Sequence, residues 1–257
     1  MAFCPLGHAD WETRELQGET ASLMRQFHRY PAVDFARYRR FVVADHHVGW
    51  VAPDFARELA AFPQVFRLDD QAVIFHDRFA EPDDRSRAIA EVLSALRERG
   101  LVPGWRGELY PVNRRFDEAP LLLMERAATP LFGVLSYGVN VNGLVRTSGD
   151  WKVWVARRSP TKQVDPNMLD LVVGGGLPYG ISIRDNVLKE CAEEAGIPAA
   201  LAEHARPAGL VTLMIAAPEG LRLGLQFNFD LELPADFTPR NTDGEVSEFQ
   251  LWTLDRL

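Results

Sequence analysis

Apolar and polar positions in the first half of the chain follow both helical and strand periods. The clearest helix is predicted within residues 83–100, because apolar residues recur at helical spacing from Ile89 to Leu96 and Gly100 follows as a stop signal. Short apolar runs between turn residues predict further elements. These are a strand pair at 41–53, a short helix at 53–62 and a hairpin at 64–76 that turns about Asp69 and Asp70.

After "VPGWRGELYPV" the pattern shifts toward strands, with an acid-rich helix between them. In chain order the elements are expected at 133–146, 151–158, 182–196, 200–205, 209–217 and 221–234. A domain boundary is placed near 125–130, which gives domains at 1–128 and 129–257. The chain stops at "LWTLDRL" without an obvious terminal element, so a few further residues are expected after it.

Local signals define the ends of the acid-rich helix. Ser182 has the side chain of an N-cap, and Asp185 three residues later gives a start that resembles a capping box. Gly196 is well placed as the C-terminal stop.

The acid-rich helix is expected to have one packed face and one acidic face. The stripe expected to face the core consists of Leu188, Cys191, Ala192 and Ala195. The acidic side consists of Glu190, Glu193 and Glu194, which fall within about 100° of one another.

Composition and charge restrict the kind of partner. The 257 residues, of which 47% are hydrophobic and 25% charged, suit a globular protein. A net charge of -8 argues against a nucleic-acid partner, although a bound divalent cation would still allow a small anionic ligand. The apolar runs are too short to span a bilayer, so no membrane partner is expected.

Two observations favour a cytoplasmic protein. Cys4 and Cys191 give neither a disulfide framework nor a metal-ligand spacing, so a reducing compartment is expected. The segment 1–10 has neither the basic start nor the apolar core of a signal peptide.

The crowded glutamates are the main candidate for chemistry. Like charges at helical spacing repel by roughly a few tenths of a kcal/mol per pair. Three glutamates on a helix usually form only a solvated face, but Mg²⁺ also prefers a few carboxylates together with the phosphates of a substrate. The glycines at 174, 175, 176 and 180 would let backbone N–H groups approach such phosphates.

The segment 175–197 resembles the Nudix box. The box pattern is Gly, five residues, Glu, seven residues, Arg-Glu, an apolar residue, any residue, Glu-Glu, any residue, Gly and an apolar residue. Here Gly175 takes the opening position and "KECAEEAGI" the end, but Ile181 stands where the first glutamate belongs and Lys189 replaces the arginine. The resemblance implies that the core glutamates bind metal and that the replaced pair mainly supports the loop-helix geometry.

Other segments resemble Nudix enzymes related to fungal and plant thiamine-diphosphate proteins. Those enzymes carry an N-terminal domain of the kind sometimes joined to a thiamine pyrophosphokinase. The matching segments are "VGWV" at 48–51, "GWRGELYPV" at 104–112, "VNGLV" at 141–145, "ARRSPTKQVDPNMLDLVVGGG" at 156–176 and "PRNTDGEV" at 239–246. They extend over nearly the whole chain from near Phe35.

The resemblance implies a fold and an activity. The fold is an α/β/α Nudix sandwich with a mixed sheet, preceded by a smaller α+β domain. The activity is cleavage of a diphosphate to a monophosphate and phosphate with Mg²⁺, or Mn²⁺ as the alternative. The implied substrates are thiamine diphosphate and its damaged oxo and oxy forms. A nucleoside diphosphate derivative such as ADP-ribose, a non-catalytic diphosphate-binding module and a homodimer all stay open.

The resemblance also suggests roles for individual acids. Glu190 and Glu194 are expected to bind Mg²⁺ and take part in catalysis, with Glu193 completing or bridging the site. Glu245 in "TDGEV" is expected to bind metal or to act as general base. The alternative for 243–245 is a tight turn with a solvated acid.

Several residues are candidates for substrate binding. Arg157, Arg158 and Lys162 would grip phosphate oxygens, or they form only a basic surface turn. Trp105 and Arg106 are further candidates for substrate binding. The Trp105 ring would stack on a thiamine-like ring, although ordinary packing of Trp105 between domains is the favoured interpretation. The remaining candidates are Gly175 and Gly176, whose N–H groups would face phosphates, and one of Asn140 and Asn142, which alternate along a strand.

Overall fold

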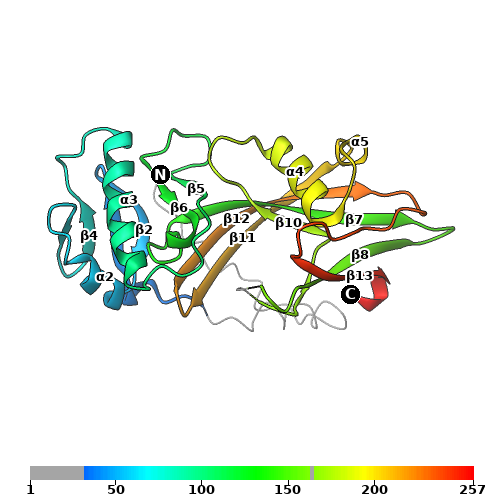
Figure 1. Ribbon diagram of the computed structural model, residues 1–257, viewed down its shortest axis with the longest axis horizontal. Helices are drawn as coiled ribbons and strands as arrows, with labels where there is room; N and C mark the ends of the chain where they lie inside the picture. The colour runs from blue at the N-terminus through cyan, green and yellow to red at the C-terminus, as the bar shows by residue number, and fades with distance from the viewer. Residues whose placement is uncertain (1–31, 163–164) are drawn as a thin grey trace, which may run out of the picture. The chain divides into compact units, whose positions relative to one another are not determined.

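The computed structural model describes residues 32–162 and 165–257 (Figure 1). Asp34–Leu257 forms one structural unit, which contains the described helices and strands. Cys4, the segment 1–10 and the opening part of the expected domain 1–128 lie outside the described residues. Within the described part, no helix combines the length and apolar character that crossing a bilayer requires.

The first half contains a four-stranded sheet and two main helices. The strands, in the order β2-β1-β4-β3, are β1 (Arg39–Val43), β2 (His46–Val51), β3 (Phe66–Leu68) and β4 (Ala72–Phe75). The helices are α2 (Pro53–Leu59) and α3 (Pro82–Glu98), and a short 3-10 turn, η2 (Phe35–Arg37), precedes the sheet. The predicted strand pair, short helix, hairpin and long helix are therefore confirmed.

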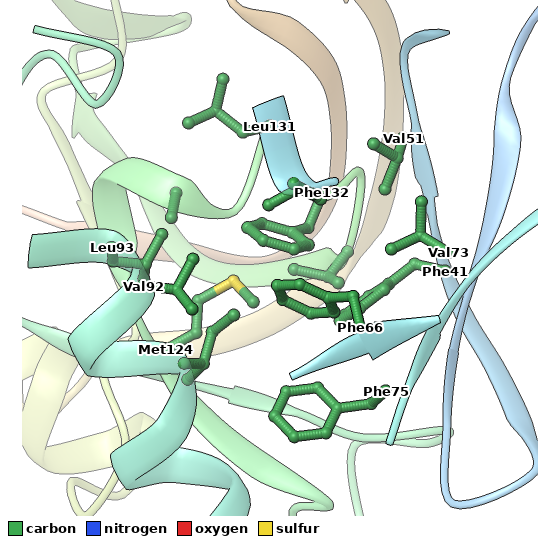
Figure 2. Close-up of a cluster of buried hydrophobic side chains, with 14 of the residues drawn as sticks. Phe41, Val51, Phe66, Val73, Phe75, Val92, Leu93, Met124, Leu131 and Phe132 are labelled. Carbon is green, nitrogen blue, oxygen red and sulfur yellow. The ribbon is translucent and has the colours of Figure 1, made fainter. Parts of the chain in front are cut away.

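The core of this half lies between the sheet and α3. Figure 2 shows the rings of Phe41, Phe66 and Phe132 gathered at its centre, with Val92 and Leu93 of α3 beside them. Phe41 and Phe132 pack with ring centroids 4.8 Å apart. Burial of such large side chains is the main source of stability in a domain of this size.

Residues after the expected boundary at 128 also belong to this core. Leu131, Phe132 and Val134 are buried in it. The backbone N–H of Trp50 in β2 donates to the carbonyl of Phe132 at 2.9 Å. Gly133 has φ +52°, and a Cβ there would lie 2.3 Å from the carbonyl oxygen of Trp50, so only glycine fits. The segment is thus fixed to β2, and the division at 128/129 stays a prediction.

A hairpin and a larger mixed sheet follow. The hairpin is β5 (Leu109–Val112) with β6 (Leu122–Glu125), followed by the 3-10 turn η3 (Arg126–Ala128). The larger sheet has the order β11-β12-β7-β8-β13. Its strands are β7 (Leu135–Arg146), β8 (Trp151–Arg158), β9 (Leu169–Asp170), β10 (Val173–Gly176), β11 (Arg206–Ala217), β12 (Gly220–Glu232) and β13 (Val246–Thr253). Because β12 pairs parallel to β7 and the other pairs are antiparallel, the expected α/β class with a mixed sheet is confirmed.

The end of the chain differs from the sequence expectation. "LWTLDRL" was expected to show no terminal element, but Leu251–Thr253 complete β13 and the 3-10 turn η4 (Leu254–Arg256) follows. Phe249 and Leu251 pack against the second core while β13 pairs with β8. The strand was missed because only two alternating apolar residues mark its buried face.

One edge of β7 is shared by two partners. Residues 138–141 pair with β10, and residues 143–146 pair with β8. Strands β8 and β10 therefore separate from each other along β7. The helices α4 (Ile183–Ala195) and α5 (Ala199–Ala202) follow β10, and the loop before β13 lies beside the end of β8.

Helix α4 has the predicted ends. The Ser182 hydroxyl accepts a hydrogen bond from the backbone N–H of Asp185 at 3.0 Å and donates to the Asp185 carboxylate at 2.6 Å. Gly196 adopts φ 60°, the left-handed conformation typical of a helix stop.

The buried face of α4 is rotated from the expected stripe. Cys191 and Ala195 are buried as expected, but Ala192 is exposed, and Glu194 lies on the packed side. The expectation was wrong at Ala192 because a helical wheel gives angles between side chains but not the neighbour that a side chain meets. Glycines of β10 leave room for carboxylates, so the helix turns Glu194 toward the sheet.

Candidate functional site

Glu194 is a buried carboxylate near the end of α4. Its residue is 8% exposed, and its Oε2 accepts a hydrogen bond from the backbone N–H of Gly174 at 2.7 Å. Burial raises the pKa of Glu194 to about 8, and the charges of Glu190 and Glu245 act in the same direction. A carboxylate in this environment ionises readily only when a positive group is close.

Two acids from the loop before β13 meet Glu194. Carboxylate oxygens of Glu194, Asp243 and Glu245 lie within 4.8 Å of one another. The loop is held by its own turn, since the Asp243 carboxylate accepts from the Glu245 N–H at 2.8 Å. Lys162 forms an ion pair with Glu245. Burial alone would raise the pKa of Glu245, but the Lys162 hydrogen bond and charge lower it, with Arg106 adding to the effect.

Glu190 lies against the glycines of β10. Its side chain is 12% exposed, and a Cβ on Gly175 would come within 2.2 Å of its Cδ. Burial raises the pKa of Glu190, although the ion pair with Lys189 at 3.1 Å opposes the rise. Gly175 is therefore glycine because the Glu190 side chain fills the place where a Cβ would project.

Glu193 has a different environment. Its side chain is 51% exposed and pairs with Lys189 at 2.7 Å. Among the carboxylates of the described residues, those that converge are Glu194, Asp243 and Glu245, and both Glu190 and Glu193 lie outside this group. The predicted role of Glu193 as a metal ligand stays a prediction.

The β5–β6 hairpin reaches the same end of β10. A Cβ on Gly176 would lie 1.8 Å from the Tyr110 hydroxyl oxygen and 3.1 Å from Cζ of Arg126. The buried Asn186 side chain of α4 donates to the Gly176 carbonyl at 2.9 Å. Gly176 is therefore required where hairpin, strand and helix meet, in addition to any role toward phosphates.

A single buried carboxylate fixes the two ends of the hairpin. Glu125 is 3% exposed and accepts hydrogen bonds from the backbone N–H groups of Arg106 at 2.9 Å, Gly107 at 3.0 Å and Ala127 at 3.3 Å. Arg126 in turn pairs with Glu108 at 3.0 Å. Arg126 lies against Gly176 of the box, and the charges of Arg106 and Arg126 lower the pKa values of Glu245 and Glu190, respectively.

The three basic residues at the end of β8 and just after it, Arg157, Arg158 and Lys162, make different contacts. Lys162 reaches the acids through its ion pair with Glu245. Arg157 donates to the carbonyl of Asn167 at 2.9 Å, and Arg158 pairs with Asp170 at 2.6 Å. These contacts hold both arginines to the segment between β8 and β9, so their grip on a phosphate stays a prediction.

The remaining candidates take part in structural contacts. Trp105 packs against the first core, and Cζ of Arg97 lies 4.7 Å from the centroid of its ring. Stacking of a substrate on Trp105 stays a prediction. The Asn140 amide donates to Asn228 at 3.0 Å and the Asn142 amide donates to Asp230 at 2.8 Å, so both asparagines link β7 to β12.

The donor set fits a hard divalent cation. Glu194, Asp243 and Glu245 offer only carboxylate oxygens, which are the ligands that Mg²⁺ and Mn²⁺ accept. Among the described residues, Lys162 forms an ion pair with this group through Glu245, and a cation would relieve the remaining repulsion between the carboxylates. The predicted role of Glu190 as a ligand of the same cation stays a prediction.

Three residues of this region were missed or undervalued in the sequence. Asp243 was regarded only as a turn residue, although its spacing of two from Glu245 in "TDGEV" was the available signal. Tyr110 and Arg126 carry no local signal, because they reach the box only through the folding of a hairpin distant in sequence.

Comparison with known families and proteins gives consistent results. A family model described as "Domain of unknown function (DUF4743)" matches residues 19–136. The Arabidopsis thaliana protein described as "Nudix hydrolase 20, chloroplastic" is 40% identical over 220 residues, which cover 82% of this chain and 59% of that protein. A second, "Nudix hydrolase 24, chloroplastic" from the same plant, is 40% identical over 213 residues, covering 82% and 58% respectively. The chain therefore spans less than two thirds of the length of these relatives.

A solved structure from Deinococcus radiodurans is also similar. It is 25% identical with a TM-score of 0.43, and the match covers 57% of this chain and 83% of that one. At this TM-score the likeness carries no argument about this chain. The two plant relatives show that the chain is similar in sequence to proteins described as Nudix hydrolases.

Proposed function

We propose that the chain is a divalent-cation-dependent hydrolase that cleaves a small-molecule diphosphate to a monophosphate and orthophosphate. The observation that carries this proposal is the convergence of the buried Glu194 with Asp243 and Glu245 within 4.8 Å. A buried carboxylate with a raised pKa beside other carboxylates is common at functional sites. The relatives named as Nudix hydrolases support the same reaction class.

The reaction assigns a task to each group. Water oxygen forms a bond to phosphorus, the bridging P–O bond breaks, and the leaving monophosphate takes the electron pair. A carboxylate of the site takes the proton from the water. When bound, Mg²⁺ neutralises the diphosphate and makes the water easier to deprotonate. Lys162 and the Gly174 N–H hold Glu245 and Glu194 in place for this arrangement.

The proposed substrate is thiamine diphosphate or one of its damaged oxo and oxy forms. The support comes from segments along both halves of the chain that resemble thiamine-diphosphate-related Nudix enzymes. ADP-ribose is the alternative substrate, since carboxylates and a cation recognise only the diphosphate. A non-catalytic diphosphate-binding module is the third possibility.

Orthophosphate release with Mg²⁺ separates these three. Thiamine, oxothiamine and oxythiamine diphosphates are assayed directly, and ADP-ribose is assayed with added phosphatase. Faster orthophosphate release from the thiamine compounds supports the proposal. Release from ADP-ribose alone would replace the thiamine compounds with ADP-ribose as the substrate. Binding of every ligand without release would reject the hydrolase.

Substitution of individual acids identifies the ligand set. Glu194→Gln is expected to lower turnover by roughly two orders of magnitude or more, because it removes a charged oxygen donor from the centre of the site. Glu193→Gln should cost much less, since Glu193 is exposed and pairs with Lys189. Glu203→Gln, an exposed acid outside the site, is the matched control. Equal rates for Glu194→Gln and the control would contradict the assignment.

A further inference from the structure

We propose that Arg106 and Arg126, both from the first half of the chain, form the binding site for a phosphoryl group of the ligand beside the carboxylates. This inference rests on the proposed function, because it takes a diphosphate as the ligand. It extends that proposal by assigning part of the diphosphate site to residues that precede the box in the sequence.

Arg126 lies directly against the box. Its Cζ would be 3.1 Å from a Cβ on Gly176, and its charge acts on Glu190. Its side chain is 41% exposed, and it pairs with the 40% exposed Glu108. An ion pair with this exposure contributes little to stability. The Arg126 guanidinium can therefore exchange Glu108 for a phosphate with little loss of folding stability.

Arg106 is tied to the same hairpin, because its backbone N–H donates at 2.9 Å to the carboxylate of Glu125, the residue before Arg126. Its charge also lowers the pKa of Glu245. Its guanidinium has no hydrogen-bond or ion-pair partner among residues 32–162 and 165–257. The buried Glu125 carboxylate therefore holds the backbone of Arg106 beside the segment that carries Arg126.

The other cations near the acids are already engaged. Lys162 pairs with Glu245, and Lys189 pairs with both Glu190 and Glu193. A diphosphate brings negative charge into an acidic environment, so it needs cationic donors in addition to the metal. Guanidinium groups match phosphate oxygens with two parallel N–H bonds, which makes the two arginines the suitable donors.

Tyr110 gives a second observation at the same place. Its residue is 2% exposed, its hydroxyl lies against Gly176, and within the described residues this hydroxyl has no hydrogen-bond partner. The ring lies 5.8 Å from Cζ of Arg126. An unused donor next to an arginine and a glycine strand is consistent with an anionic ligand at this point.

The test is equilibrium binding of methylenediphosphonate with Mg²⁺, because its P–C–P bridge resists hydrolysis. Arg126→Ala and Arg106→Ala should each weaken binding by roughly tenfold to a hundredfold, the loss of a charged hydrogen bond. Arg126→Lys should recover part of the loss. Arg114→Ala is the matched control, since Arg114 is an exposed arginine of the same half that also pairs with a glutamate, Glu118, at 2.8 Å.

Mn²⁺ binding without the diphosphonate separates this proposal from a purely supporting role. Removing the charge of Arg126 or Arg106 next to carboxylates should leave Mn²⁺ binding unchanged or make it tighter. Weaker Mn²⁺ binding in parallel with weaker diphosphonate binding would overturn the proposal, as would unchanged diphosphonate binding in both variants. If Arg126→Ala does not fold, Arg106→Ala decides alone, because the Arg106 guanidinium makes no hydrogen bond or ion pair with the described residues.

The same data keep the two proposals apart. Loss of diphosphonate binding in the arginine variants, in a wild-type chain that hydrolyses nothing, would reject the hydrolase and retain the phosphoryl site. Wild-type hydrolysis with diphosphonate binding unaffected by either arginine variant would do the reverse.

Discussion

Glu194 concentrates the chemistry of the site in one residue. Its carboxyl is buried beside Glu190 and Glu245, and its pKa is raised to about 8. Without a metal, the protonated Glu194 carboxyl is favoured in its buried position, whereas a bound cation requires the ionised carboxylate. Metal binding and proton loss at Glu194 are therefore expected to be coupled.

This coupling gives a pH dependence of stability in the presence of a chelator. The pKa of Glu194 is about 8 in the folded state against the usual glutamate value of 4.5, so the folded state retains a proton that the unfolded state loses. The free energy of unfolding should therefore fall as pH rises from about 5 to about 8. Urea unfolding at several pH values should show this fall, by at most a few kcal/mol, relative to Glu194→Gln. Parallel pH profiles for the two proteins would contradict it.

At the scale of elements, the glycines of β10 leave space that side chains from other elements occupy. Gly175 makes room for Glu190, and Gly176 makes room for Tyr110 and Arg126. At Gly174 a Cβ would meet only the Asn140 side chain, at 3.3 Å. The three glycines therefore differ in what a methyl group would displace.

Alanine substitutions in β10 should reveal this difference. Gly175→Ala is expected to push Glu190 aside and to lower both turnover and Mn²⁺ affinity, by roughly tenfold or more. Gly174→Ala should have the smaller effect, because the Asn140 side chain can give way. The measurements are kcat and a Mn²⁺ titration for each variant. A greater loss in Gly174→Ala would show that the backbone at Gly174, rather than space for Glu190, controls the site.

Elements could be predicted where the residues that define them lie close together in the sequence, and contacts between distant segments could not. Helix α4 was predictable with both ends, because Ser182 and Gly196 act within a few residues. The burial of Glu194 was not, since it depends on β10 and on the loop of Asp243. The contact of Arg126 with the box is set by the tertiary packing of a hairpin, which no local pattern encodes.

At the scale of the whole molecule, a cation that binds only the folded chain should stabilise it. Saturation to a hundred times the dissociation constant adds about 2.7 kcal/mol to the free energy of unfolding. Mg²⁺ should therefore raise the melting temperature of the wild type by a few degrees but not that of Glu194→Gln. Because the chain carries a net charge of -8, a monovalent salt at equal ionic strength is the control for screening. An equal rise in both proteins would point to screening alone.

The attachment of Phe132 and Gly133 to β2 has a consequence for the evolution of the protein. The carbonyl of Phe132 accepts a hydrogen bond from the Trp50 N–H, and Gly133 has no room for a side chain beside β2. The Tyr179 N–H likewise donates to the carbonyl of Leu109 at 2.8 Å, across to the hairpin. A recombination event that joined the second half to a foreign first half would have to bring matching partners for all of these contacts. The two halves are therefore expected to be inherited and to evolve together, rather than to be exchanged as separate modules.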